Sequence, residues 1–410
     1  MRYYVESYGC TMNYGEGFQL SERMSALGHE KTDSAETADI VVLNTCTVVD
    51  ATEKKMIKRM SDLRNMGKEV IVTGCMAKVQ TNRITIRLPD SLVIPPGGYD
   101  DFSSLVEERY GCGCITETAE SGNIIPIAQG CLGACTYCIT KFARGSLVSY
   151  PADELVGRFN RMIDAGTKEI LITAQDTACY GLDTGTNLAS LIGKMLEREG
   201  EYRIRIGMMN PNLLRPILDR LLDVMEDRRV YRFLHIPVQS GSDTILDSMG
   251  RNYTRDEFLS MVGRIRSRFP DMSISTDIIS GFPGETDEDH MKSIGLIEEL
   301  KADTINITRF SARPGTEAAE MEQVHGRIVK ERSTHLTEVK NTTEYNVNSE
   351  LVGREFNVLV TENGRAGSKI ARTDNYRPVA VETDLPIGAF ARVQITGCAS
   401  TYLTGRVLNN

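Results

Sequence analysis

Gly130-Cys131-Leu132-Gly133-Ala134-Cys135-Thr136-Tyr137-Cys138 is the stretch that decides the fold, because it places three cysteines in a CxxxCxxC spacing on one short loop. A cubane iron–sulfur cluster normally has four cysteine ligands, one for each iron. Three cysteines on one loop leave one iron open, and none of the five histidines is near enough in sequence to be an obvious fourth ligand. The loop therefore predicts a [4Fe–4S] cluster with one iron free to bind a small molecule.

Around this loop, β-rich runs alternate with helical patterns. The predicted strands are Ile124 to Ala128, Glu169 to Thr173, Arg203 to Met208, Arg232 to Val238, Met272 to Ile279 and Thr304 to Phe310. Between them, stretches such as Asp153 to Asp164 and Arg255 to Arg268 carry apolar residues at helical spacing. The pattern predicts a (βα)6 barrel, an incomplete relative of the eightfold barrel, with its site at the carboxyl ends of the strands.

Upstream, each of three β-rich runs in the first 110 residues is followed within one or two residues by a cysteine. The pairs are Arg2 to Tyr8 with Cys10, Ile40 to Asn44 with Cys46, and Glu69 to Thr73 with Cys75. Helical stretches such as Thr52 to Met66 separate the runs, so a parallel sheet is expected, and its carboxyl edge should gather the three thiols. A lone cysteine is more often a small core residue. Zinc thiolate sites usually use paired CxxC ligands, so three unpaired cysteines favour a second cluster.

Downstream, a linker helix over Ile328 to Asn348 leads to short alternating runs. They are Phe356 to Thr361, Lys369 to Thr373, Pro378 to Val381, Ala389 to Thr396 and Tyr402 to Val407. These runs predict a small antiparallel β-barrel, an architecture that often contacts RNA. Here RNA binding is inferred from the fold by analogy.

Composition limits the alternatives. Ten cysteines among 410 residues favour metal ligation over disulfides. The N-terminal residues show no secretory leader pattern, so a cytoplasmic protein is expected. No apolar run approaches the length that spans a bilayer. The net charge of −9 is the wrong sign for binding nucleic acid through bulk electrostatics, so any RNA binding must be local.

With these motifs together, the chain resembles the radical S-adenosylmethionine (SAM) superfamily and, over its whole length, the methylthiotransferases. Further matches are His235-Ile-Pro-Val-Gln239-Ser-Gly-Ser, Arg251-Asn-Tyr253-Thr and Asp277-Ile-Ile-Ser-Gly-Phe-Pro-Gly-Glu285-Thr. The resemblance implies a methylthiotransferase domain over residues 1–110 with an auxiliary cluster, a radical SAM domain with linker helix over 120–348, and a TRAM-like RNA-binding barrel over 349–410. The implied fold class is α/β, with a parallel α/β domain, a partial (βα)6 barrel and a small antiparallel barrel.

The resemblance also implies the cofactors and their ligands. It implies two [4Fe–4S] clusters, one on Cys10, Cys46 and Cys75 and one on Cys131, Cys135 and Cys138, together with SAM. Asp176, Gln239 and Ile279 are the candidates for contacting SAM, with Asp176 in place of the usual acid that holds the SAM amino group and Ile279 against adenine. Ordinary packing inside the barrel is an equally good interpretation of Gln239 and Ile279.

The resemblance implies transfer of a methylthio group to N6-threonylcarbamoyladenosine next to the tRNA anticodon. Gln175-Asp-Thr-Ala-Cys-Tyr-Gly181 and Gly207-Met-Met-Asn-Pro211 are similar to archaeal and eukaryotic enzymes with that substrate. Isopentenyladenosine tRNA and a ribosomal-protein aspartate are the alternative substrates, and a non-enzymatic iron–sulfur RNA-binding redox sensor is the alternative of another class. The expected partners are the tRNA anticodon stem-loop, an electron donor such as a ferredoxin or flavodoxin, and a sulfur source, with no membrane.

Cations offer weaker predictions. The threonylcarbamoyl carboxylate calls for a cation, for which Arg205 and Arg309 on barrel strands are candidates. A run such as Glu53-Lys-Lys-Met-Ile-Lys-Arg59 usually forms a solvated helix face. The alternative interpretation is that it forms, together with Lys141 and Arg144, a rim that contacts phosphates. Three further cysteines, Cys112, Cys114 and Cys179, are expected to be incidental, although Cys179 alternatively carries sulfur.

Overall fold

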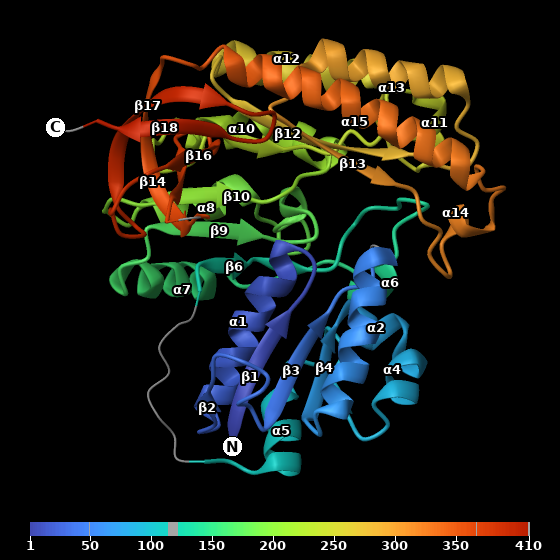
Figure 1. The fold of residues 1–410 in the computed structure, drawn as a ribbon, viewed down its shortest axis with the longest axis vertical. Coiled ribbons are helices and arrows are strands. Elements are labelled where there is room, and N and C mark those ends of the chain that lie inside the picture. The colour runs from blue at the N-terminus through green and yellow to red at the C-terminus, as the bar shows by residue number, and fades with distance from the viewer. Residues whose placement is uncertain (49, 114–121, 366, 409–410) are drawn as a thin grey trace. The chain divides into compact units, whose positions relative to one another are not determined.

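The computed structural model describes residues 1–48, 50–113, 122–365 and 367–408. The chain forms two compact units (Figure 1). The first unit contains Met1–Gly133, Cys138–Ala165 and Thr173–Gln175, and the second contains Ala134–Tyr137, Gly166–Ile172 and Asp176–Asn410.

The first unit is built on a parallel sheet of five strands in the order β2-β1-β3-β4-β5. Its strands are β1 (Arg2–Ser7), β2 (Glu30–Lys31), β3 (Ile40–Thr45), β4 (Glu69–Gly74) and β5 (Leu92–Val93). Its helices are α1 (Thr11–Ala26), α2 (Asp50–Asn65), α3 (Cys75–Val79), α4 (Thr81–Arg87) and α5 (Phe102–Tyr110). The predicted parallel sheet is therefore confirmed.

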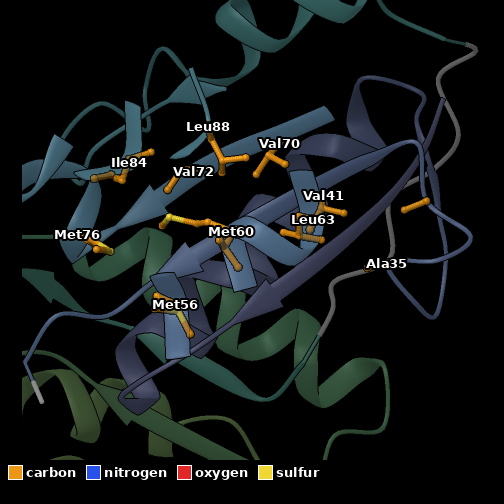
Figure 2. Packing of buried hydrophobic residues seen from close by; sticks show 13 residues of the cluster. Ala35, Val41, Met56, Met60, Leu63, Val70, Val72, Met76, Ile84 and Leu88 are labelled. Atoms are coloured by element: carbon orange, nitrogen blue, oxygen red, sulfur yellow. The ribbon is translucent and has the colours of Figure 1, made fainter. Parts of the chain in front are cut away.

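Alternate residues of the central strands face two separate hydrophobic clusters. Val41 and Leu43 of β3 pack in the cluster that includes Met56 and Met60 of α2, which Figure 2 shows from close by. Ile40 and Val42 face the other way, into the cluster that includes Leu20 and Met24 of α1 and Phe102 of α5. Helices on both faces explain why β3 is apolar on both sides rather than alternating. Each fully buried aliphatic side chain stabilises the sheet by about 1.5–3 kcal/mol.

The rest of the first unit surrounds the three-cysteine loop. It consists of β6 (Ile124–Pro126), β7 (Ala128–Gln129), α6 (Thr140–Arg144), β8 (Val148–Ser149) and α7 (Ala152–Asp164). The predicted single strand over 124–128 is divided at Ile127, whose amide donates to the Thr173 carbonyl while its own carbonyl accepts from Tyr150. Pro126 lacks an N–H, which is consistent with an interruption of the strand at this point.

The second unit carries the remaining barrel strands and their helices. Its strands are β9 (Glu169–Thr173, whose last residue belongs to the first unit), β10 (Arg203–Ile206), β11 (Phe233–His235), β12 (Ser273–Ser280) and β13 (Thr304–Arg309). The helices are η1 (Thr177–Cys179), α8 (Leu188–Leu196), α9 (Pro211–Leu214), η2 (Arg215–Ile217), α10 (Leu218–Val224), α11 (Asp243–Ser248), α12 (Arg255–Arg268), α13 (Asp287–Leu300), α14 (Glu317–Glu320) and α15 (Gly326–Ser349).

These strands are parallel, so their carboxyl ends share one edge. β10 pairs with β9, and β12 pairs with both β11 and β13. An isolated parallel bridge between Ile204 and Val230 joins β10 to the segment before β11. These strands begin within one residue of their predicted starts, but β10 and β11 end two and three residues earlier than predicted. The mixed α/β class with parallel sheets is confirmed.

The C-terminal part of the second unit is a closed five-strand barrel in the order β14-β15-β16-β18-β17. Its strands are β14 (Glu355–Asn363), β15 (Lys369–Thr373), β16 (Pro378–Val381), β17 (Phe390–Cys398) and β18 (Leu403–Val407). Val358, Val360, Val393 and Ile395 are among its core residues. β16 and β18 pair in parallel and the other neighbours are antiparallel, so the predicted barrel is confirmed with one parallel pair.

Tyr376, in the turn between β15 and β16, packs this barrel against β11 and the residues before it. Its ring centroid lies 4.9 Å from that of Tyr231 and 5.0 Å from that of Phe233. The Arg205 guanidinium lies over Phe233 at 5.3 Å and over Tyr376 at 5.6 Å. Phe233 is the first residue of β11, so Arg205 is held toward the amino ends of the strands by cation–π contacts. The hypothesis that Arg205 binds a substrate carboxylate is not supported.

Across the part of the chain that the structure describes, no helix is long and apolar enough to cross a membrane.

Candidate active site and cluster ligands

Cys10, Cys46 and Cys75 follow three adjacent strands of the first unit. Cys10 is the N-cap of α1, Cys46 follows β3, and Cys75 is the first residue of α3. Cys46 and Cys75 are buried and Cys10 is exposed. The pKa of the Cys75 thiol is raised to about 11, mainly by burial and to a smaller extent by Cys46 and Cys10, while Arg144 opposes the rise. The three side chains are thus close enough to interact electrostatically.

Two glycines allow the three loops to approach one another. A Cβ on Gly9, whose φ is +106°, would lie 2.6 Å from the Cys46 Cβ atom and 2.8 Å from its Sγ atom. A Cβ on Gly74, whose φ is +81°, would lie 2.2 Å from the carbonyl oxygen of Thr45. Both positions therefore require glycine for backbone conformation and for space. A glycine directly before Cys10 and before Cys75 is the sequence signal for this close approach.

Replacing Gly74 by Ala should destabilise the first unit by about 3 kcal/mol, because it combines a strained backbone conformation with a clash against a neighbouring strand. Gly67→Ala is the matched control: its φ is +65° but a Cβ there would meet nothing within 4 Å, so a loss of about 1 kcal/mol is expected. Urea unfolding measures both variants. Equal losses would show that the contact with Thr45 is unimportant.

Asn13 joins the loops by hydrogen bonds to the main chain. Its Nδ2 atom donates to the Tyr8 carbonyl at 2.7 Å and to the Thr45 carbonyl at 2.9 Å. The Asn44 side chain donates in turn to the Asn13 carbonyl at 2.6 Å. Asn13 and Asn44 are fully buried, so these bonds fix the backbone next to the cysteines. Sequence reasoning missed both residues.

Arg144, on α6, belongs to this same site. Its Nε atom donates to the Cys75 Sγ atom at 3.3 Å, and its guanidinium forms a bidentate ion pair with the Glu16 carboxylate. Arg144 is 3% exposed and Glu16 is 1% exposed. The hypothesis that Arg144 belongs to a phosphate-contacting rim is wrong, because a buried, paired guanidinium cannot contact a phosphate. Arg59 of the proposed rim also forms an ion pair, with Glu6 at 2.9 Å. Lys54, Lys55 and Lys58 lie on the exposed side of α2.

The three-cysteine loop runs from β7 to α6, and its cysteines are partly exposed. In the first unit, Gly130 donates its amide proton to the Gln175 Oε1 atom at 2.8 Å, and Gly133 donates to the Cys131 Sγ atom at 3.2 Å. In the second unit, Thr136 donates its amide proton to the Met249 carbonyl at 3.1 Å. The loop is therefore anchored at both ends.

Among the described residues, no three His, Cys, Asp or Glu side chains gather in the way that would hold a single metal ion. In a cubane cluster each cysteine binds a different iron, so its ligands do not converge on one point.

Asp176 is the candidate that fits a cationic ligand. It lies three residues after the end of β9, as the N-cap of η1, and is 1% exposed. Its Oδ1 atom accepts from the amides of Ala178 at 3.0 Å and Asn210 at 3.2 Å, whereas its Oδ2 atom has no partner among the described residues. Burial raises the pKa of Asp176 to about 6, although the two amides and the charge of Arg251 lower it. A buried carboxylate oxygen without a partner suits the ammonium group of a ligand.

Gln239, four residues after the end of β11, lies beside Ile279 near the end of β12. Gln239 has a φ of 74°, a strained conformation for a non-glycine residue. Its amide donates to the Asp277 carbonyl, its carbonyl accepts from Ile279, and its Oε1 atom is buried without a partner among the described residues. Ile279 is partly buried and packs against the hydrophobic cluster that contains Phe282.

A chain of polar side chains crosses three neighbouring strands. The Nε2 atom of His235 on β11 lies 2.9 Å from the Asp277 Oδ1 atom on β12, and Asn306 on β13 donates to the same oxygen at 2.8 Å. Burial alone would raise the pKa of Asp277, but the bonds from His235 and Asn306 bring it below its usual value. Asp277 is thus held ionised and fixes the His235 ring. Nothing in the local sequence around Asn306 pointed to this role.

Arg309 is the last residue of β13 and is exposed, with its Nε atom donating to the Ser333 Oγ atom of α15 at 2.7 Å. It therefore remains a candidate for a carboxylate at the carboxyl edge.

The other cysteines differ in their surroundings. Cys179 is fully buried and its thiol donates to the Asp176 carbonyl at 2.9 Å, which does not favour a sulfur carrier. Cys112 is exposed, Cys114 lies outside the described residues, and Cys398 is partly buried against the core of the small barrel.

Three protein families match consecutive parts of the chain. Residues 2–94 match the Uncharacterized protein family UPF0004, residues 125–297 match the Radical SAM superfamily, and residues 349–408 match the TRAM domain. Among solved structures, the radical S-adenosylmethionine methyltransferase TsrM from Kitasatospora setae is similar with a TM-score of 0.59 and 13% identity, over 78% of this chain and 76% of that one. This likeness concerns the fold alone.

Curated relatives match over the full length. A probable threonylcarbamoyladenosine tRNA methylthiotransferase of Pyrococcus abyssi is 40% identical, with all of both chains covered. The corresponding protein of Archaeoglobus fulgidus is 40% identical over 99% of each chain. The human threonylcarbamoyladenosine tRNA methylthiotransferase is 35% identical over 88% of this chain and 65% of its own. With this identity over its full length, and a radical SAM domain at its centre, the chain belongs to the family of threonylcarbamoyladenosine tRNA methylthiotransferases.

Proposed function

We propose that this protein replaces the hydrogen on carbon 2 of N6-threonylcarbamoyladenosine in tRNA by a methylthio group, using radical SAM chemistry. The observation that carries the proposal is a contact within the first unit: α6, which begins two residues after Cys138, places Arg144 against the Cys75 thiol. A helix that follows the radical loop thus reaches the thiol-lined sheet edge. The assignment of this substrate is supported by a relative of that name that is 40% identical over the full length of the chain.

The donor sets fit two iron–sulfur clusters. Cys131, Cys135 and Cys138 would hold the cluster that the radical SAM family implies, and we propose that Cys10, Cys46 and Cys75 hold a second one. Thiolates are the usual ligands of such clusters, and each set of three leaves one iron without a cysteine. When bound, the radical cluster supplies the electron that splits SAM, and the protein supplies position and surroundings.

The residues of the second unit would then bind and orient SAM. We propose that Asp176 accepts from the SAM ammonium group through Oδ2, that Gln239 faces the ligand through its unpartnered Oε1 atom, and that Ile279 packs on adenine. The His235 ring, held by Asp277, which in turn accepts from Asn306, would supply a fixed hydrogen-bonding group at this site.

The substrate adenine has to be turned out of the anticodon loop to reach this site, as bases of single-stranded RNA usually are when proteins read them. The threonylcarbamoyl carboxylate calls for a cation, and exposed Arg309 is our candidate. An isopentenyl group has no carboxylate, so it would leave such a cation unpaired. The further partners that we propose are a low-potential electron donor and a sulfur source.

The decisive experiment incubates reconstituted enzyme with SAM, a reductant and tRNA that carries threonylcarbamoyladenosine. Mass spectrometry of the digested tRNA should show the 2-methylthio derivative, and the supernatant should contain 5′-deoxyadenosine. Isopentenyladenosine tRNA should remain unmodified. Modification of that tRNA instead would overturn the substrate assignment, and absence of 5′-deoxyadenosine would favour a non-enzymatic redox sensor.

We further propose that the small barrel binds tRNA through a local patch of arginines. Arg392 of β17 and Arg406 of β18 are exposed on the same outer face of the barrel. Arg392 and Gln394 are two residues apart on one strand and therefore share this face. Arg406 lies opposite Gln394 and donates to its side chain at 2.9 Å. Arg392 also pairs with Glu355 at 2.8 Å but stays exposed, whereas Arg372 and Arg377 are largely buried and pair with Glu362 and with Asp303. We therefore expect only some of the arginines of the C-terminal barrel to contact tRNA.

Replacing Arg392 and Arg406 together by Ala should weaken tRNA binding and make the slope of log affinity against log salt concentration shallower by about 1.4, at about 0.7 for each lost phosphate contact. Fluorescence anisotropy at several salt concentrations gives this slope. The matched control is Arg215→Ala with Arg264→Ala, two exposed arginines of the second unit that pair with Glu257 and Asp219. An unchanged slope in the first variant would rule out this face.

Asp176→Asn should stabilise the free protein at high pH while weakening SAM binding. The pKa of about 6, against 3.8 ordinarily, means that Asp176 costs stability progressively as pH rises from 4 to 6, and the full cost of at most about 3 kcal/mol persists above pH 6. The variant should therefore unfold at higher urea concentration at pH 8 and show no gain at pH 4. Asp256→Asn, at an exposed side chain, is the control. Undiminished SAM affinity by calorimetry would contradict the proposed role.

A further inference from the structure

We propose that Arg144 is a positioning residue that raises the reduction potential of an auxiliary cluster held by Cys10, Cys46 and Cys75, and that Glu16 opposes it. This inference rests on the proposed function of these three cysteines. It starts from one contact: the Arg144 Nε atom donates to the Cys75 Sγ atom at 3.3 Å.

The guanidinium has little freedom to turn away from the thiol. Its NH1 and NH2 atoms bind the two carboxylate oxygens of Glu16, and NH2 also donates to the Asn13 Oδ1 atom at 2.6 Å. The side chains of Arg144 and Glu16 are 1% and 2% exposed. Two parallel bonds to a carboxylate fix the plane of a guanidinium, so the remaining Nε–H is aimed at sulfur.

A merely structural interpretation explains this arrangement poorly. Buried ion pairs usually contribute little net stability, because removing two charges from water costs about as much as their attraction returns, and apolar residues of similar volume often serve equally well. Here one arm of the pair ends on a predicted cluster ligand. Hydrogen bonds to cysteine sulfur are among the features that set the potential of an iron–sulfur cluster.

The sign of the effect follows from charge. Reduction adds one electron from an external reductant to the cluster and breaks no bond. An N–H donor and a positive guanidinium stabilise the more negative, reduced state and therefore raise the potential. The Glu16 carboxylate stabilises the oxidised state and lowers the potential. Removing Glu16 and removing the whole pair should consequently shift the potential in opposite directions, which a loss of packing would not do.

The experiment uses the full-length chain with Cys131, Cys135 and Cys138 replaced by Ala, so that only the auxiliary cluster is reconstituted with iron and sulfide. Its signal is followed by electron paramagnetic resonance during titration with a reductant of known potential. If this background binds no iron, the auxiliary cluster itself is refuted, which is a failure of the proposed function. If it binds iron, the variants test Arg144.

In this background, Arg144→Met with Glu16→Gln should lower the ratio of reduced to oxidised cluster at a given potential by about tenfold, which is about 59 mV for a one-electron couple. Glu16→Gln alone should raise the ratio. The matched control is Arg158→Met with Glu22→Gln, which removes another ion pair of the same unit, at 2.9 Å. This control should leave the ratio unchanged.

No shift beyond that control, or shifts of both test variants in the same direction, would overturn the proposal. If the double variant loses its iron, Glu16→Gln alone decides, because it keeps Arg144: a raised ratio supports the proposal and an unchanged one refutes it. Arg144→Lys keeps the charge but loses the fork, so a ratio between those of the parent and the double variant is expected.

Discussion

Replacing Cys131, Cys135 and Cys138 by Ala is expected to abolish SAM cleavage, so that 5′-deoxyadenosine falls below detection. The iron that binds SAM belongs to a cluster that these three thiolates would hold, and without it no electron reaches the sulfonium. Enzymes typically accelerate reactions by at least about 10⁶-fold, so no residual turnover should remain. Chromatography of the supernatant after incubation with SAM and dithionite measures the product.

A suitable control for this variant is Cys112→Ala with Cys398→Ala, which removes two thiols that lie outside both cysteine sets. It should cleave SAM at the parental rate. Persistent 5′-deoxyadenosine from the triple variant would mean that the CxxxCxxC loop does not hold the radical cluster, whatever the family resemblance implies.

The elements that sequence reasoning found are those with local signals. The parallel strands of the first unit can be predicted from β-rich runs such as Ile40 to Asn44, which is buried on both faces because helices cover both. The closed C-terminal barrel followed from short alternating runs. The positions of Cys46 and Cys75 at strand ends could also be predicted, because the spacing between a strand and the cysteine after it is a local property of the sequence.

The contacts that sequence reasoning missed depend on partners far apart in the chain. Arg144 looked like a surface cation because its neighbour Lys141 is one, yet its carboxylate partner, Glu16, lies 128 positions away. Arg205 looked like a free cation on a barrel strand, but Tyr376 of the C-terminal barrel occupies its guanidinium face. Asn306 has no motif around it and matters only because β13 lies beside β12. Such pairings arise from tertiary packing, which overrides local pattern.

The reciprocal experiment replaces Cys10, Cys46 and Cys75 together by Ala. Iron content should fall by roughly half, because one of two similar clusters is lost, while 5′-deoxyadenosine continues to form. The methylthio product should disappear, since the proposed sulfur-carrying cluster is gone. Arg144 and Glu16 still neutralise one another in this variant, so the buried charges need not disrupt the fold.

The two triple variants should therefore both retain about half the iron but differ in activity. The variant without the CxxxCxxC cysteines should not cleave SAM, whereas the variant without the cysteines at the sheet edge should still cleave it. Iron analysis, 5′-deoxyadenosine release and nucleoside mass spectrometry on the same preparations separate these outcomes. Unchanged iron in the Cys10, Cys46 and Cys75 variant would show that the thiols at the sheet edge hold no cluster. The burial of Cys46 and Cys75 beside Gly9, Gly74 and Asn13 would then serve packing, and the sulfur would have to enter by another route.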